Sequence, residues 1–303
     1  MSSDEGPVVQ SALLRDELVR LRTRRGLTQQ QVAAALEWSP SKLIRVEGGK
    51  SSITKVDLDA LLTEYGVTSE SHRERLQVLR SGTREAGWWN AYKDSVSATY
   101  LRYVGFEAAA AVIRQFQTNF IPALLQTPEY SEIVTIAGSV EPHLVRPIVE
   151  LRLQRQTELL RRSAPPRQYF VLDEGVIRRH VGIKKDRSVM PNQLRFVADR
   201  AERDDLVTVR VLPFEAGAHT GLEPFTLLQF DARLPDTLIL DADRGDFTMI
   251  AENDPQAAKA QVEKVDKYVQ YFESLIEDAW PADRSIEFMR KVADEMSRQD
   301  YAR

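Results

Sequence analysis

Between Thr28 and Lys50 the sequence places small polar and basic side chains at helical spacings. Ser41 and Arg45 are four residues apart, and Lys42 follows Ser41 directly. Residues four apart lie on the same side of a helix. A guanidinium group donates a planar fork of N–H bonds, which can bridge the O6 and N7 atoms of guanine. These residue types in this pattern predict recognition of duplex nucleic acid.

The capping pattern predicts two short helices joined by a fixed turn, which is called the elbow below. The second helix carries these side chains. Thr28, with Gln31 three residues later, forms a capping box that begins one helix. Ser39 followed by Pro40 supplies an N-cap and a first-turn proline for the next helix. The second helix should direct Leu43 and Val46 inward and Ser41, Ile44 and Arg45 outward. A short helix presented in this way fits the major groove of DNA.

An amphipathic helix precedes this pair. Leu14, Leu18 and Leu21 recur at i, i+4 and i+7, which predicts a helix that runs to about Arg25. Gly26 then serves as the residue that ends it.

Charge is concentrated near these elements. The chain of 303 residues carries a net charge of −4, but residues 15–50 hold eight basic and four acidic side chains. That segment is therefore positive, while the remainder is strongly acidic. We expect contact with double-stranded DNA to be confined to the N-terminal region.

The stretch from about Ser11 to Gly66 resembles the Xre-type helix-turn-helix of phage repressors and many bacterial regulators, which has a lambda repressor-like all-α fold. The resemblance is carried by LRTRRGLTQQQVAAAL, SPSKLIRVEGGK and VDLDALLTEYGV. It implies a structural ion pair between Arg22 and Glu47. It also implies an elbow that usually holds glycine, where this chain has Glu37; a non-glycine residue at positive φ costs of order 1 kcal/mol. The DNA-binding residues implied are Gln29 and the flanking Lys42 and Lys50 on phosphates, and Ser39, Pro40, Ser41 and Arg45 along the helix edge.

Helix and strand patterns alternate irregularly in the rest of the chain. RQYFVLDE, DLVTVRVLPF, EPFTLLQFD and DTLILDA are typical of strands, and MPNQLRFVADRAER is typical of a helix. This order predicts an α+β domain, so the whole chain is expected to be α+β with an all-α head. The expected divisions are the head at 11–70, a helical connector at 71–87, an α+β effector, partner or dimerisation domain at 88–280, and a helical tail at 281–303 that either closes the core or mediates self-association.

Aromatic residues are concentrated where the second domain begins. Large aromatics dominate ordinary cores, so we expect core packing there. The alternative is the wall of a ligand pocket. The residues of that candidate pocket are Trp88, Trp89, Tyr92 and Tyr103, with His219 from a loop farther along the chain.

The second domain resembles that of a large actinobacterial regulator family, in which an Xre-type head precedes a domain of uncharacterised function. Trp88-Trp89, GFEAAA, IPALLQTPEY, RLQRQ, LDEGVIRR, NQL and VRVLPFEAGAH carry this resemblance. It implies antitoxin-like or developmental regulators that are commonly encoded beside a small partner protein.

Several classes of function are disfavoured. The chain has no cysteine, and its four histidines share no helix-turn spacing, so we expect no metal site and no cofactor. No apolar run or leader indicates membrane insertion or secretion, so we expect a cytoplasmic protein. Asp173 and Glu174 are adjacent carboxylates whose side chains should diverge, and the sequence shows no catalytic motif. We expect no enzymatic activity.

These observations favour a DNA-binding transcriptional regulator that acts as a homodimer on an inverted repeat. One helix in one groove contacts few base pairs, so specificity normally requires two half-sites. Two alternatives remain. One is an antitoxin-like protein that sequesters a small neighbour-encoded partner, and the other is a regulator that responds to a small-molecule effector.

Overall fold

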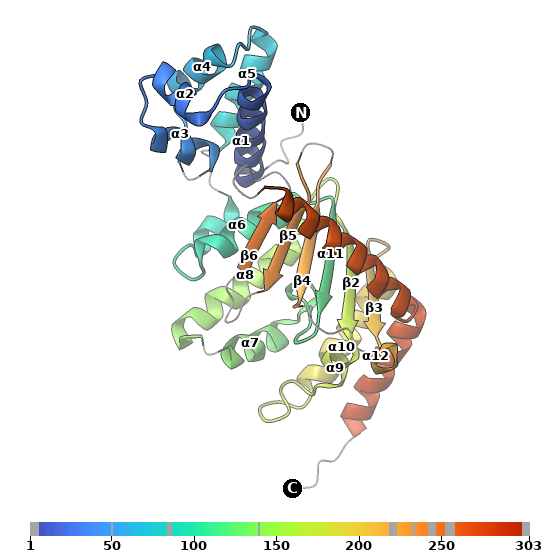
Figure 1. Cartoon of the computed structure of the whole chain (residues 1–303). Helices are drawn as coiled ribbons and strands as arrows, with labels where there is room; N and C mark the ends of the chain where they lie inside the picture. Colours follow the sequence, from blue (N-terminus) through green and yellow to red (C-terminus); the bar gives the residue numbers. More distant parts are fainter. Residues whose placement is uncertain are drawn as a thin grey trace.

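A small helical head is joined to a larger domain built on one sheet (Figure 1). The computed structural model describes residues 6–49, 51–83, 87–138, 140–217, 223–231, 234–241, 247–251 and 258–298. The head consists of α1 (Pro7–Arg24), α2 (Gln29–Ala35), α3 (Pro40–Glu47), α4 (Lys55–Glu64) and α5 (Glu70–Gly82).

The head folds around one apolar core to which all five helices contribute. Leu18 of α1, Leu43 of α3 and Leu58 of α4 are fully buried within it. Helix α5 occupies most of the segment expected to be a connector, and it packs along α1. Its Leu76 and Leu79 are buried in the same core. The fifth helix therefore completes the head, while the domain limits remain a prediction.

The sequence signals at Thr28 and Gly26 lie where α2 begins and α1 ends. The Thr28 hydroxyl accepts a hydrogen bond from the Gln31 N–H at 3.2 Å, and the Gln31 side-chain oxygen accepts one from the Thr28 N–H at 2.9 Å. This confirms the capping box. Gly26 ends α1 with a φ of +67°, in the left-handed region that glycine adopts without strain. Helix α1 begins at Pro7, earlier than the sequence pattern indicated.

The second domain contains a mixed six-stranded sheet in the order β3-β2-β1-β4-β5-β6. The three strands β1, β2 and β3 run parallel, and β4, β5 and β6 continue the sheet in antiparallel pairs. The strands are β1 (Val112–Gln117), β2 (Arg167–Asp173), β3 (Val207–Leu212), β4 (Phe225–Gln229), β5 (Thr237–Asp241) and β6 (Phe247–Ala251).

Helices cover both faces of this sheet, which explains why its central strands are buried. Helix α11 lies across one face (Figure 1) and buries Val265, Phe272 and Leu275 against it. The other helices build the larger core on the opposite face. The helices of the second domain are α6 (Ala98–Glu107), α7 (Pro128–Ala137), α8 (Pro142–Leu160), α9 (Glu174–Arg178), α10 (Val189–Arg203), α11 (Ala258–Asp278) and α12 (Ala282–Arg298). Short 3₁₀ turns lie at Trp88–Tyr92, Ala123–Leu125 and Phe214–Ala216.

The α+β prediction is confirmed, and β2, β3, β4, β5 and α10 fall on the predicted segments. Strands β1 and β6 were not predicted. The expected tail helix is α12, which closes the core by burying Met289, Val292 and Met296 beside α10 and β3. The Ser285 hydroxyl accepts a hydrogen bond from the Val211 N–H at 3.0 Å, so the start of α12 covers the edge of β3.

Helix α1 belongs to both parts of the molecule. Its first turns, with Val8 and Ala12, pack against the second domain, and its later turns, with Leu14 and Leu18, lie in the head core. One continuous helix therefore fixes how the head sits on the second domain.

Candidate nucleic-acid interface

Helix α3 presents one polar edge to solvent. Ser39, Pro40, Ser41 and Arg45 are exposed, while Leu43 on the opposite side is fully buried. The Ser39 hydroxyl does not cap the helix; it lies 3.3 Å from the Ser41 hydroxyl. The helix thus displays hydroxyl groups at its beginning and a guanidinium group in its last turn. This edge combines the four residues that the sequence predicted to lie along the helix edge in contact with DNA.

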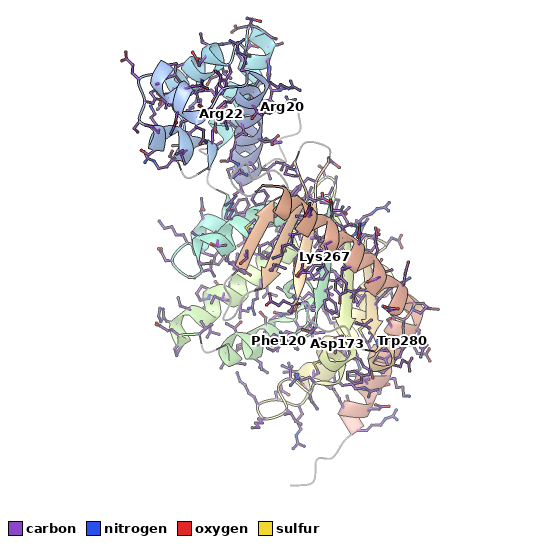
Figure 2. All side chains as sticks on the ribbon, viewed as in Figure 1. Arg20, Arg22, Phe120, Asp173, Lys267 and Trp280 are labelled. Atoms are coloured by element: carbon purple, nitrogen blue, oxygen red, sulfur yellow. The ribbon has the colours of Figure 1, made fainter. Side chains whose placement is uncertain are left out.

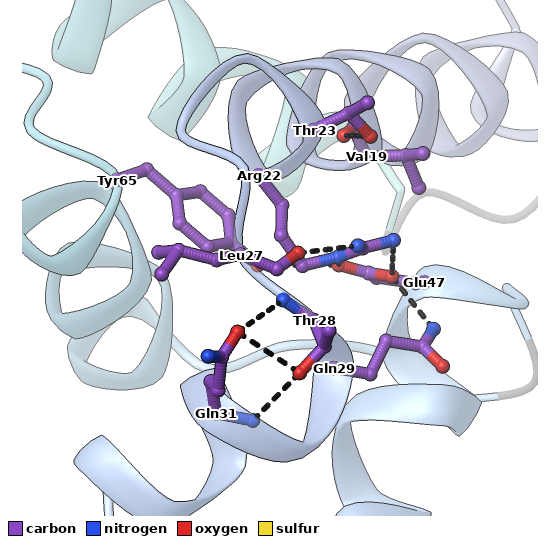
Figure 3. A network of polar contacts seen from close by, with 9 residues as sticks. All are labelled: Val19, Arg22, Thr23, Leu27, Thr28, Gln29, Gln31, Glu47 and Tyr65. Carbon is purple, nitrogen blue, oxygen red and sulfur yellow. Dashed lines mark hydrogen bonds and ion pairs between the residues drawn. The ribbon is translucent and has the colours of Figure 1, made fainter.

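A buried carboxylate fixes α3 to the rest of the head (Figure 3). Glu47 is 1% exposed and accepts hydrogen bonds from the Arg22 guanidinium at 2.8 and 3.0 Å. It also accepts from the Gln29 amide at 2.8 Å and from the Tyr65 hydroxyl at 3.2 Å. Arg22 additionally donates to the Leu27 carbonyl at 2.9 Å. The ion pair implied by resemblance is therefore present, and it joins α1, α2, α3 and the end of α4.

The charges in this network reinforce one another. The hydrogen bond to Glu47 raises the pKa of Arg22. Burial, together with the nearby Glu47 charge, raises the pKa of Tyr65 well above its usual value. Both shifts favour a charged Arg22 beside a neutral Tyr65 around the Glu47 carboxylate.

The elbow between α2 and α3 places Glu37 in the left-handed region, with a φ of +55°. Among the described residues it is the only non-glycine residue with a positive φ. The Trp38 N–H donates to the Ala33 carbonyl at 2.8 Å and so closes the turn. The chain therefore retains the expected turn geometry with a residue that disfavours it.

Lys42 is held in place by two contacts that the sequence did not predict. Its Nζ donates to the Asp57 carboxylate at 2.9 Å and lies 3.8 Å from the centre of the Trp38 ring. Asp57 belongs to α4, so only the arrangement of α4 relative to α3 would have suggested this ion pair. Trp38 lies in the turn just before α3, four residues from Lys42. The ammonium group is restrained at the border of the exposed edge.

Gln29 and Lys50 were both predicted to contact phosphate, and the structure describes only Gln29. The Gln29 amide group donates to Glu47, so its side chain contributes to the network inside the head. Its phosphate contact stays a prediction. Lys50 lies outside the described residues.

Comparison with known families agrees with this division of the chain. A helix-turn-helix domain family matches residues 13–76, and the family described as a domain of unknown function, DUF5753, matches residues 100–291. The second match spans more than half of the chain. The chain belongs to the DUF5753 family. Searches of curated proteins and of solved structures gave no match. In this DUF5753 protein the helix-turn-helix head supports DNA binding and a role in transcription regulation.

The aromatic residues of this DUF5753 protein are distributed between packing and a cavity. Trp88 and Trp89 are packed edge to face, with ring centres 5.7 Å apart. They line a cavity of about 330 Å³ together with Val104 and a buried ion pair formed by Glu107 and Arg155. Arg155 donates to Glu107 at 2.7 and 2.6 Å. Two of the predicted pocket residues therefore reach this cavity.

The other predicted pocket residues do not line it. The Tyr103 hydroxyl donates to the Glu107 carboxylate at 2.8 Å from within the core, and the Tyr92 hydroxyl donates to the Gln154 side chain at 2.8 Å. His219 lies outside the described residues. The ligand-pocket alternative named Trp88 and Trp89 but missed Glu107 and Arg155, because an ion pair between residues 48 positions apart leaves no local pattern.

The adjacent carboxylates have structural partners. Asp173 accepts a hydrogen bond from the Gly175 N–H at 2.7 Å, and Glu174 accepts one from the Phe214 N–H at 2.9 Å. Figure 2 places Asp173 in the second domain, whereas Arg22 lies in the head. In the described part of the chain no cluster of acidic and histidine side chains could hold a metal ion. None of the described helices combines the length and apolar character that a bilayer span requires.

Proposed function

We propose that this chain is a sequence-specific transcriptional regulator of the Xre type, in the actinobacterial family that joins such a head to a domain of uncharacterised function. It acts in the cytoplasm as a homodimer on an inverted repeat. The observation that carries the proposal is the exposed edge of α3, on which Ser41 and Arg45 point outward while Glu47 anchors the opposite side. A rigidly held helix loses little entropy on binding, so its contacts contribute fully to affinity.

Energetics supports two copies of the head for each site. A good bidentate contact between a side chain and a base contributes about 1–3 kcal/mol of discrimination, and a helix of eight residues can make only a few. Specific sites need discrimination of about 4–10 kcal/mol against other DNA. Two heads on half-sites about one turn apart supply that difference.

Selection from a randomised DNA pool with the full chain tests this function. We expect enrichment of an inverted repeat, and light scattering of the selected complex should give two chains for each duplex. If no sequence were enriched, the proposed function as a sequence-specific regulator would be overturned. Enrichment of one isolated half-site with one bound chain would overturn only the homodimer.

A small-molecule sensor is the second candidate, and the cavity beside Trp88 and Trp89 supports it. An apolar wall that faces a buried ion pair suits a ligand with a planar apolar part and a polar group. Because Trp89 also packs beside the first turns of α1, a ligand there would act on the helix that holds the head. Addition of a small-molecule extract should change the DNA affinity of the wild type but not of Trp88→Ala. Equal responses would contradict this role.

The antitoxin-like alternative is supported by the resemblance of the second domain. Its partner would be a small protein encoded next to this chain. Co-expression followed by purification of this chain tests it, and the absence of the neighbour from the purified material would contradict it.

A further inference from the structure

The exposed edge of α3 carries one apolar side chain among its polar ones. Ile44 is 38% exposed, and it lies one position from Arg45 and three from Ser41. Positions three apart on a helix differ by about 60° around its axis, so Ile44 and Ser41 share one side. Ile44 therefore projects from the same surface as the predicted base-contacting residues.

Ile44 is not one of the described side chains that form the head core. Within the described residues, the head core is formed by other side chains of α3, namely Leu43 and Val46. Its neighbours along the edge, Ser41 and Arg45, carry hydroxyl and guanidinium groups, so Ile44 is an exposed apolar side chain on a polar surface. A branched side chain is also stiff about χ1, so little side-chain entropy is lost when Ile44 contacts a ligand.

The major groove offers one apolar group among its donors and acceptors, which is the C5-methyl group of thymine. We propose that Ile44 contacts a thymine methyl group in each half-site, within the same groove segment in which Arg45 contacts guanine. This inference rests on the proposed function and adds a second specificity-determining residue. It predicts that the half-site contains thymine as well as guanine.

Replacement of thymine by deoxyuracil tests the contact, because it removes the methyl group and preserves base pairing. The duplex is the one selected by the wild-type chain, with each thymine replaced in turn. For one thymine in each half-site, we expect wild-type affinity to fall about fourfold, the effect of exposing one buried methyl group. Ile44→Ala should bind the thymine and deoxyuracil duplexes equally.

Val78→Ala provides the matched control. Val78 is 53% exposed on α5, which packs against α1 rather than beside the α3 edge. This variant should keep the wild-type fourfold difference. The inference is overturned if Ile44→Ala retains the difference, or if the wild type is insensitive at every thymine while still binding its selected sequence. A failure to select any sequence would overturn the proposed function and this inference together, so the two failures are distinguishable.

Discussion

Val8 of α1 lies directly over Gly105 of α6, and a Cβ atom on Gly105 would be 2.5 Å from the Val8 Cγ2 atom. The absence of a side chain at this position lets the first turns of α1 approach the second domain. Because the later turns of α1 lie in the head core, this contact determines how the head is held. Any signal from the second domain to the DNA-binding edge can be transmitted through α1.

Gly105→Ala should lower the free energy of unfolding by about 1–3 kcal/mol, because the stiff Val8 side chain and the Trp89 ring oppose the new methyl group. Val8→Ala should relieve the clash, so the double variant should be more stable than the sum of the single effects. Gly82→Ala is the control, since the three atoms nearest to its Cβ all belong to the flexible end of Gln10. Thermal unfolding of the four variants measures this coupling, and strictly additive effects would contradict it.

Arg22→Ala should destabilise the protein by about 3–5 kcal/mol, because it leaves the Glu47 carboxylate buried without its cation. DNA binding should be lost through unfolding of the head. Arg20→Ala removes an exposed ion pair with Glu17 and should change the stability by less than about 1 kcal/mol. Denaturant unfolding compares the two, and wild-type stability of Arg22→Ala would be inconsistent with the anchoring role of this pair.

Glu37→Gly should raise the free energy of unfolding by about 0.5–1 kcal/mol. Glycine relieves the cost of a positive φ, and this gain exceeds the extra entropy of the unfolded chain. Glu37→Ala keeps the Cβ atom and removes the rest of the side chain, so it should bring no such gain. Denaturant unfolding measures the free energy of unfolding of both variants. An equal increase in the two would exclude backbone strain at Glu37.

The stability of the second domain should fall in alkaline solution. Burial raises the pKa of Tyr130 to about 12 from 10.0, and its hydroxyl accepts a hydrogen bond from the Ile121 N–H at 3.1 Å. The folded state thus holds a proton that the unfolded state releases, so this contribution is complete below pH 10 and is lost as the pH rises toward 12. The total loss is about 2–3 kcal/mol. Tyr130→Phe should show a correspondingly smaller loss over that range, and identical pH profiles would rule out the contribution of Tyr130.

Local signals predicted the head well because each helix there begins and ends on its own residues. Thr28, Gln31, Pro40 and Gly26 act within one turn of their positions. The sheet was harder to predict. Strand β1 follows a run of alanines that is typical of a helix, and it carries Arg114 in the middle of a buried sheet. Its strand character depends on pairing with β2 and β4, which lie far along the chain.

The residues of the candidate site could also be predicted only in part. The exposed positions of α3 follow from helical spacing, so Ser41 and Arg45 could be found in the sequence. The contacts of Glu47 with Tyr65 and of Lys42 with Asp57 depend on how α4 packs beside α3. Resemblance supplied the partner of Arg22, but no local pattern supplied the others.

The most direct test of the central claim compares the base preferences of the wild type and Arg45→Ala in one randomised DNA pool. The wild type should enrich guanine at one position in each half-site. Arg45→Ala should lose that preference while keeping the others, with an affinity loss of about 5- to 150-fold for each lost contact. Arg20→Ala should select the wild-type sequence. An unchanged guanine preference in Arg45→Ala would contradict the assignment of this α3 edge to base recognition.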